Sequence, residues 1–165
     1  MKAVANSSIL IALSTIGQLG LLPQRFPGGV LVPTAVWQEV VEAGKGQPGA
    51  AEIASASWIT VGEVKDKGLV SLLRAELDEG EAEAIALGHE RQAEVVMLDE
   101  KDARRAARRL GLVVLGTVGL LVWAKRAGLI GSLGEQLSAL QAQGKFRLSR
   151  MVYQEALRAV GEIET

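Results

Sequence analysis

The chain has 165 residues, of which 48% are hydrophobic and 22% charged, so it can bury a core and is not a disordered protein. Eighteen Lys and Arg residues oppose nineteen Asp and Glu residues, which argues against a polycation that coats nucleic acid. The lack of cysteine excludes disulfides, thiolate zinc sites and a cysteine nucleophile, and the single histidine, His89, excludes two-histidine metal motifs.

The first half of the chain alternates short β-branched runs with segments of helical apolar spacing. In chain order we predict a strand at 2–5, a helix at 9–22, a strand at 30–32, a helix at 33–41 and a weaker strand at 58–61. Pro-Gly-Gly at 27–29 makes a turn, and the Gly and Pro content of 44–49 is typical of a loop.

The second half repeats this alternation and ends in helices. We predict a helix from Asp78, a strand at 94–98, a basic helix at 102–110, a strand at 112–115, and helices at 117–127, 132–143 and 149–160. The unbroken apolar run at 95–98 suits a parallel strand that is buried on both faces.

Alternating strands and helices predict an α/β fold with a central parallel sheet of about five strands. We expect a single domain over 1–165, in which 132–165 form a C-terminal helical extension. The longest uncharged apolar stretch, 110–124, is shorter than the roughly 20 residues of a membrane span. Asn6-Ser7-Ser8 also interrupts the first apolar run, so we expect a cytoplasmic protein without a signal peptide or a membrane partner.

Acidic and amide side chains gather near the predicted carboxyl ends of strands, where parallel sheets place their chemistry. Asn6 follows the first strand, Asp99 follows the fourth, Glu39 lies on the helix after the second, and Glu81 lies in the acidic start of another helix. Carboxylates at one sheet edge form a plausible hard-oxygen site for Mg²⁺ or Mn²⁺. Such an ion can supply a hydroxide nucleophile and offset charge that develops on a phosphodiester.

Five segments in this order resemble the PIN domain family. They are residues 4–13, 32–41, 77–87, 95–100 and 107–117. The resemblance covers nearly the whole chain, and it is strongest to a PIN-like branch of uncharacterised prokaryotic proteins related to VapC toxins.

The resemblance implies a three-layer α/β/α fold and a ribonuclease that depends on Mg²⁺ or Mn²⁺. The acidic site would fall on Asn6, Glu39, Glu81 and Asp99, with Glu39, Glu81 and Asp99 as its catalytic acids and Ser8 as a small hydroxyl residue that contacts substrate. The implied partners are single-stranded RNA, a small antitoxin protein if the chain is the toxin of such a pair, and a second copy of the chain in a homodimer.

The chain departs from the family pattern at two places. Active members carry Asp where this chain has Asn6, which keeps an oxygen ligand but loses a negative charge. Many also carry a further acid just past the fourth strand, and Glu100 and Asp102 both remain candidates. The alternative function is therefore a PIN-like domain that binds RNA or a protein partner with weak or no cleavage.

Each candidate also has a purely structural interpretation. Asn6, Ser8 and Asp99 are residue types that cap helices, and Asp78 with Glu81 matches a capping box. Glu42, one helical turn from Glu39, is a rival for the same role. For Glu39, as for any glutamate on a helix, a solvated carboxylate is the default.

A basic run follows Asp99. It consists of Lys101, Arg104, Arg105, Arg108 and Arg109. The ordinary interpretation is a solvated helix surface, and the functional one is contact with RNA phosphates, chiefly through Arg104, Arg105 and Arg108.

Two other classes fit less well. A receiver-type signalling domain would use Asp99 and Thr117, but it needs an acidic pair after the first strand, where Asn6-Ser7-Ser8 stands. Nucleotide-binding folds need a glycine-rich phosphate loop, and Gly44-Lys45-Gly46 lacks the spacing of one.

Overall fold

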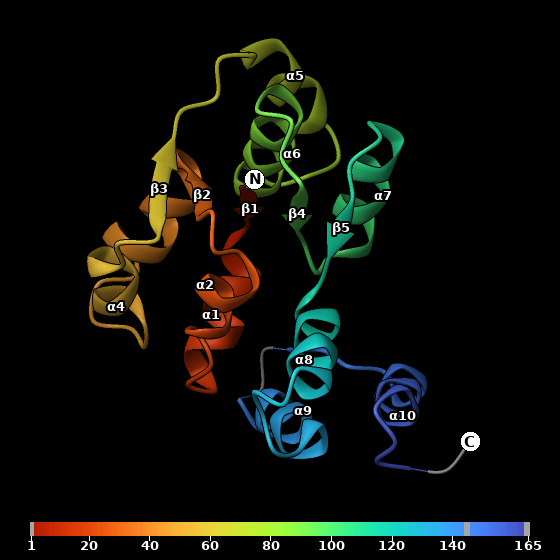
Figure 1. The fold of residues 1–165 in the computed structure, drawn as a ribbon. Coiled ribbons are helices and arrows are strands. Elements are labelled where there is room, and N and C mark those ends of the chain that lie inside the picture. Colours follow the sequence, from red (N-terminus) through yellow and green to blue (C-terminus); the bar gives the residue numbers. More distant parts are fainter. Residues whose placement is uncertain (1, 144–145, 164–165) are drawn as a thin grey trace.

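The computed structural model describes residues 2–143 and 146–163, which contain one sheet of five strands. The strands are β1 (Ala3–Ala5), β2 (Val30–Pro33), β3 (Ile59–Gly62), β4 (Val95–Met97) and β5 (Val114–Leu115). Every neighbouring pair is parallel, and the order across the sheet is β3-β2-β1-β4-β5 (Figure 1). The predicted parallel five-stranded sheet is confirmed.

Helices connect the strands. They are α1 (Ser7–Thr15), α2 (Leu21–Arg25), α3 (Thr34–Trp37) with the π-helical turn η1 (Gln38–Glu42), α4 (Ala50–Ser55), α5 (Lys67–Leu73), α6 (Glu79–Glu90), α7 (Lys101–Arg109), α8 (Thr117–Arg126), α9 (Leu133–Ala142) and α10 (Arg150–Ala159). In the part of the chain that the structure describes, no helix is both long and apolar enough to cross a membrane.

The continuous helix predicted over 9–22 is wrong, because the segment forms two helices. Gly17 adopts a left-handed conformation with φ +68°, which ends α1 and lets the chain turn into α2. Leu19 and Leu22 remain fully buried, so two separate segments produce the apolar spacing of one helix. α4 and α5 have no counterpart among the predicted elements. α5 buries no residue completely, and it starts where the Asp66 carboxylate accepts the Leu69 N–H.

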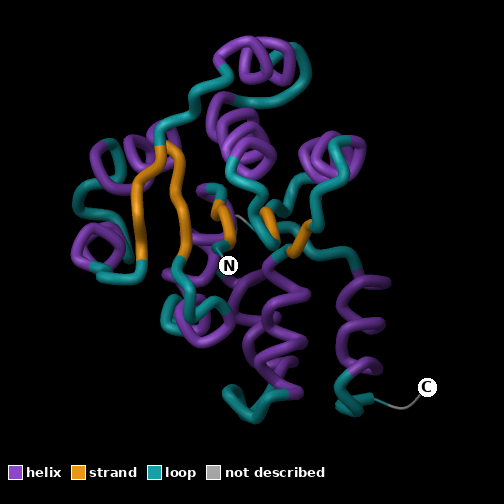
Figure 2. Tube along the Cα trace, turned by 45° about the horizontal axis from the view of Figure 1, so that its top comes forward, coloured by secondary structure: helices purple, strands orange, loops and turns teal. Residues whose placement is uncertain are grey.

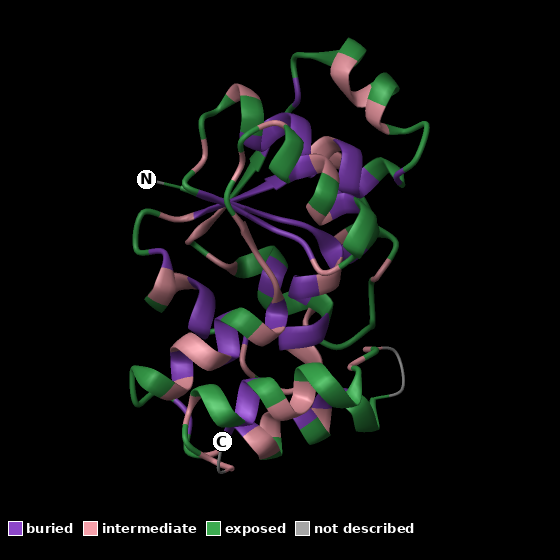
Figure 3. Cartoon of the chain, turned by 90° about the vertical axis from the view of Figure 1, so that its right-hand side faces the viewer, coloured by how far each residue is buried: buried purple, intermediate pink, exposed green. Residues whose placement is uncertain are grey.

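Successive strand residues point to opposite faces of the sheet and build two cores. Ala3, Ala5 and Met97 pack on α1, α2, α8, α9 and α10, whereas Val4 and Val96 pack on α6 and α7. Figures 2 and 3 show the strands between the two helical layers, with the buried residues concentrated along them. The three-layer α/β/α fold is thereby confirmed.

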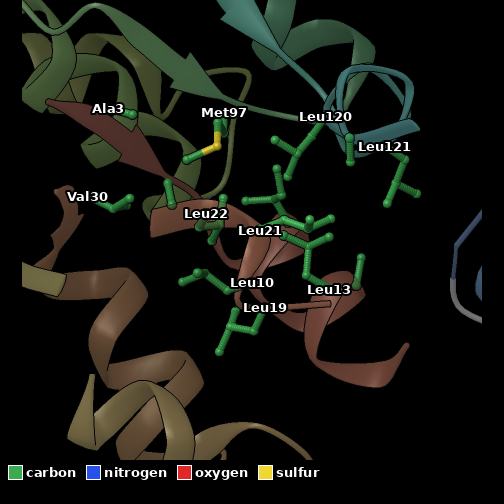
Figure 4. Packing of buried hydrophobic residues seen from close by; sticks show 14 of the residues in the cluster. Ala3, Leu10, Leu13, Leu19, Leu21, Leu22, Val30, Met97, Leu120 and Leu121 are labelled. Atoms are coloured by element: carbon green, nitrogen blue, oxygen red, sulfur yellow. The ribbon is translucent and has the colours of Figure 1, made fainter. Parts of the chain in front are cut away.

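The larger core is aliphatic. Leu10 and Leu13 of α1 lie among Leu19, Leu22 and Leu120, and all five are inaccessible to solvent or nearly so (Figure 4). Complete burial of each such side chain contributes about 1.5–3 kcal/mol. This core holds α1 and α8 in place, and the first turns of both helices border the candidate site described below.

The order in which strands are added to the sheet changes side at β1: β2 and β3 lie on one side of it, and β4 and β5 lie on the other. The connection after β1 enters α1 in one layer, and the connection after β4, which pairs with β1 on its other side, enters α7 in the opposite layer. Because the two connections diverge, a crevice opens at the carboxyl ends of β1 and β4, which is where open α/β sheets bind ligands.

Beyond α10, Glu162 ties the end of the described chain to the start of α9 through hydrogen bonds and to Lys125 of α8 through an ion pair. The Glu162 carboxylate accepts the Leu133 N–H at 2.6 Å and the Gly134 N–H at 3.0 Å, and it accepts the Ser132 hydroxyl at 3.2 Å. Its Oε2 atom lies 3.7 Å from Lys125 Nζ. Partial burial opposes ionisation, but these hydrogen bonds and the Lys125 charge outweigh it and hold the pKa of Glu162 below its usual range.

We predict that Glu162→Gln destabilises the protein by about 1–2 kcal/mol at neutral pH, because the helix terminus loses its anion. A carboxylate with a lowered folded-state pKa stabilises the fold above its unfolded pKa, and this contribution disappears as the pH falls through the folded-state pKa. Urea unfolding across the acidic range measures it. Glu155→Gln, an exposed change on α10, is the control. Equal losses at neutral and acidic pH would contradict the electrostatic explanation.

Candidate active site

Asn6 occupies the position before α1 but does not cap it. Its backbone is extended (φ −87°, ψ 168°), its N–H donates to the Met97 carbonyl at 3.2 Å, and its side chain makes no capping hydrogen bond. The residue is only 5% exposed. A Cβ atom on Gly80 would lie 3.3 Å from Asn6 Oδ1, so the amide oxygen reaches the first turn of α6. The amide therefore faces the acidic start of α6.

The two serines after Asn6 differ in their environments. Ser7 donates a hydrogen bond of 2.6 Å to Glu39 Oε2. The Ser8 hydroxyl oxygen is buried and has no hydrogen-bond partner in the described structure. A buried hydroxyl without a partner costs free energy, which a ligand oxygen at this place would recover.

Glu39 lies in the π-helical turn η1, where the Ala43 N–H donates to the Gln38 carbonyl five residues earlier at 2.7 Å. Single π-helical turns inside helices are frequent at functional sites. The bond to Ser7 holds Glu39 toward the end of β1, and the residue borders a cavity of about 270 Å³ with Asp78 and Glu79. Glu42, its rival, makes neither contact.

Glu81 forms the capping box that its spacing predicts. Its N–H donates to Asp78 Oδ1 at 2.8 Å, and its carboxylate accepts the Asp78 N–H at 3.1 Å. The residue is 6% exposed. Burial raises the pKa of Glu81; the hydrogen bond from Asp78 opposes this, and the nearby carboxylates of Asp78 and Glu100 add to it. A cation beside Glu81 would offset both the desolvation of its carboxylate and the repulsion from the neighbouring carboxylates.

Asp99, after β4, binds the start of α8 and not the helix that follows it. Its two oxygens accept the N–H and the hydroxyl of Thr117, each at 2.7 Å. The position before α7 belongs to Glu100, whose side chain makes no capping bond. Each carboxylate oxygen keeps a further lone pair for another ligand.

The structure distinguishes the two acids that the sequence leaves open past the fourth strand. Glu100 borders the same cavity as Ser8 and Asp99, and its charge acts on Glu81. Asp102 is exposed and borders a different cavity with Arg105. Glu100 is therefore the better placed of the two.

The predicted RNA-contacting arginines separate into two groups. Arg104 is half-buried and borders the cavity of Asp99 and Glu100, whereas Arg105 and Arg108 border another cavity with Lys101 and Arg109. None of these five cations forms an ion pair with a described carboxylate. The α7 helix therefore presents cations in two directions, one of them toward the candidate site.

The acids do not form a ready-made metal cage. Within residues 2–143 and 146–163, no three His, Asp or Glu side chains gather closely enough to hold one ion. Glu39, Glu81 and Asp99 each accept a hydrogen bond from a different partner, which are Ser7, Asp78 and Thr117 respectively. The donors nevertheless fit a hydrated Mg²⁺ or Mn²⁺ ion, which binds through one or two carboxylates and keeps several waters.

Two further residues at the site have no predicted role. Ser7 orients Glu39, and Arg147, in the segment between α9 and α10, borders the cavity of Asp99. No periodicity or motif marks Arg147, because only the tertiary fold brings it beside the strand ends. Ser7 could have been noticed, since it adjoins Asn6.

We predict that Glu81→Gln raises the thermal stability of the protein at neutral pH in EDTA. The amide keeps the acceptor of the capping box but removes a buried charge near Asp78 and Glu100. A carboxylate with a raised folded-state pKa gives its full stabilisation below the unfolded pKa and loses it as the pH rises through the folded-state pKa. In acid Glu81 is protonated and uncharged, so the stability gained by Glu81→Gln should disappear there.

Differential scanning fluorimetry against pH measures this effect, with the exposed first-turn change Glu79→Gln as the matched control. The control should alter stability by less than about 0.5 kcal/mol. A neutral or destabilising Glu81→Gln would mean that the carboxylate serves the helix cap alone.

Comparison with known proteins agrees with this fold. A solved PilT N-terminus domain protein from the hyperthermophilic archaeon Sulfolobus solfataricus P2 aligns with a TM-score of 0.51 over 91% of this chain and 99% of its own, at 18% sequence identity. At that identity, the likeness concerns the fold alone. No curated protein matches the chain. The family model for the PIN domain matches residues 2–162, and the chain belongs to the PIN domain family.

Proposed function

We propose that the protein is a divalent-metal-dependent endoribonuclease. PIN domains are generally nuclease folds that use divalent metals. The observation that carries the proposal is the group of oxygen ligands at the crevice beside β1 and β4: the buried Glu81 beside Glu100, the Asn6 amide oxygen at the start of α6, and Asp99. Carboxylates that repel one another at a ligand crevice suit a bound cation.

Glu81 and Asp99 would hold the ion, with Asn6 as a neutral oxygen ligand and Glu39 as a further acid. A bound Mg²⁺ or Mn²⁺ ion supplies Lewis acidity toward water and the phosphoryl oxygens. Thr117 fixes the orientation of Asp99, and Asp78 fixes that of Glu81, so little side-chain entropy remains to be lost when a ligand binds. Ser8 and Arg104 would contact the phosphate, and Arg105 and Arg108 more distant phosphates.

The second candidate function is a PIN domain that binds RNA or a protein without cutting. Asn6 favours it, because a neutral amide stands where active members have a carboxylate and metal affinity should fall accordingly. A toxin role with a small antitoxin, a homodimer and a cytoplasmic location also belong to the proposal. They rest on the family resemblance alone.

We predict that the protein cleaves a mixed single-stranded RNA pool with Mn²⁺ and not with EDTA, and that Asp99→Asn lowers the rate at least about a hundredfold. The amide at this position can still accept the Thr117 N–H and donate to the Thr117 hydroxyl, so α8 should stay anchored. Glu94→Gln, an exposed change at the amino end of β4 that is prepared in parallel, should cleave like wild type. Equal cleavage by Asp99→Asn and wild type would indicate a contaminating nuclease or a misplaced site.

We predict that Asn6→Asp tightens Mn²⁺ binding about tenfold or more, because the ion gains a full negative ligand. The same change should destabilise the metal-free protein, since a buried carboxylate is added beside the start of α6. Calorimetric Mn²⁺ titration and thermal unfolding in EDTA measure the two effects. Cleavage gained only in Asn6→Asp would establish the non-cutting function for the natural sequence, and unchanged Mn²⁺ affinity would remove Asn6 from the site.

A further inference from the structure

A cavity of about 580 Å³ lies at the candidate site, and its volume is within the range of small-molecule sites. Ser8, Asp99, Glu100 and Arg104 border it from α1, the end of β4 and α7. The segment 146–148 and Val152 of α10 border it from the C-terminal part of the chain. The cavity therefore joins the proposed catalytic acids to a part of the chain that the catalytic proposal does not use.

The charged side chains of this cavity do not neutralise one another. Arg104 and Arg147 share it with Asp99 and Glu100, yet none of the four forms an ion pair within 4.0 Å in the described structure. Arg104 and Glu100 even stand four residues apart at a helix start, where a pair would be ordinary. Two guanidinium groups thus remain available to bind an anion beside the acids.

The remainder of the cavity is apolar. Val114, Leu115, Val118, Phe146, Leu148 and Val152 border it. Gly119, in the first turn of α8, adds no side chain, and a Cβ atom there would come within 2.9 Å of Leu115 Cδ1. An aromatic ring and aliphatic groups next to two cations suit a ligand that is flat and apolar at one end and anionic at the other.

The Ser8 hydroxyl adds an independent observation. It borders this cavity, and its oxygen is buried without any hydrogen-bond partner. A phosphate oxygen in the cavity would accept a hydrogen bond from the Ser8 hydroxyl and so supply the missing partner.

We propose that this cavity is a nucleotide subsite that takes one nucleotide of the RNA strand next to the cleaved bond. Its phosphate binds Arg147, Arg104 and the Ser8 hydroxyl, and its base packs on Phe146, Leu148 and Val152. The inference rests on the proposed function and adds to it Arg147, a residue of the segment between α9 and α10. Base stacking on an aromatic ring tolerates any sequence, so the subsite selects single strands over duplexes.

The first test is fluorescence anisotropy with a labelled single-stranded hexaribonucleotide of mixed sequence, in EDTA so that metal-dependent cleavage does not intervene. Arg147→Gln should weaken binding about tenfold and reduce the salt dependence by the share of one phosphate, about 0.7 in the logarithmic slope. Arg150→Gln, an exposed change three residues away, is the matched control and should alter affinity less than about twofold. Equal effects of the two variants would overturn the proposal.

The second test addresses the base. An abasic hexamer with the same phosphates should bind wild type about tenfold more weakly than RNA, because stacking is lost. Val152→Trp fills the apolar end from a partly exposed position, so this variant should bind RNA and the abasic strand alike. No preference for RNA over the abasic strand in wild type would contradict a base-binding role.

Binding and cleavage separate the two proposals. If Arg147→Gln loses RNA affinity while wild type never cleaves with Mn²⁺, the subsite stands and the nuclease does not. If wild type cleaves and Arg147→Gln cleaves with unchanged KM and kcat, the nuclease stands and the subsite is wrong. A duplex of the same length that binds as tightly as the single strand would also overturn the subsite.

Discussion

The parallel pairing of β1 with β4 is the constraint on which the rest of the site depends. Three residues of each strand are in register, from Ala3 opposite Val95 to Ala5 opposite Met97. This register places the ends of the two strands together, and the connections then leave for opposite helical layers. Asn6 and Asp99 thus flank one crevice although 92 residues lie between them in the chain.

Local hydrogen bonds then set the conformation of each acid separately. Ser7 holds Glu39, Asp78 holds Glu81, and Thr117 holds Asp99. Each of these bonds would also form in a protein without any metal, which is why capping and ligation are not competing explanations here. The negative charge of Glu81 differs from these hydrogen bonds, because it destabilises the fold: burial and the neighbouring carboxylates both disfavour the ionised form. A structure that retains such a cost at a ligand crevice is consistent with a functional site.

The sequence predicts the parallel sheet well because apolar runs report burial directly, whereas the three layers follow from the resemblance to the PIN domain family. It also places Asn6 and Asp99 at strand ends, since a strand end needs only local information. It fails at Gly17, where one glycine divides a helix without disturbing the apolar spacing. It cannot find Arg147, because the tertiary packing of the C-terminal helices brings that residue to the cavity.

The π-helical turn that carries Glu39 has a consequence for insertions and deletions in this region. The wider turn contains one residue more than an α-helical turn, and Ala43 closes it on the Gln38 carbonyl. Removal of one residue between Gln38 and Glu42 would return the segment to regular α-helical geometry and change which residue of the turn faces Ser7 and which faces the core. The length of this turn, as much as its residue types, therefore keeps Glu39 against Ser7 while Val40 stays buried in the core.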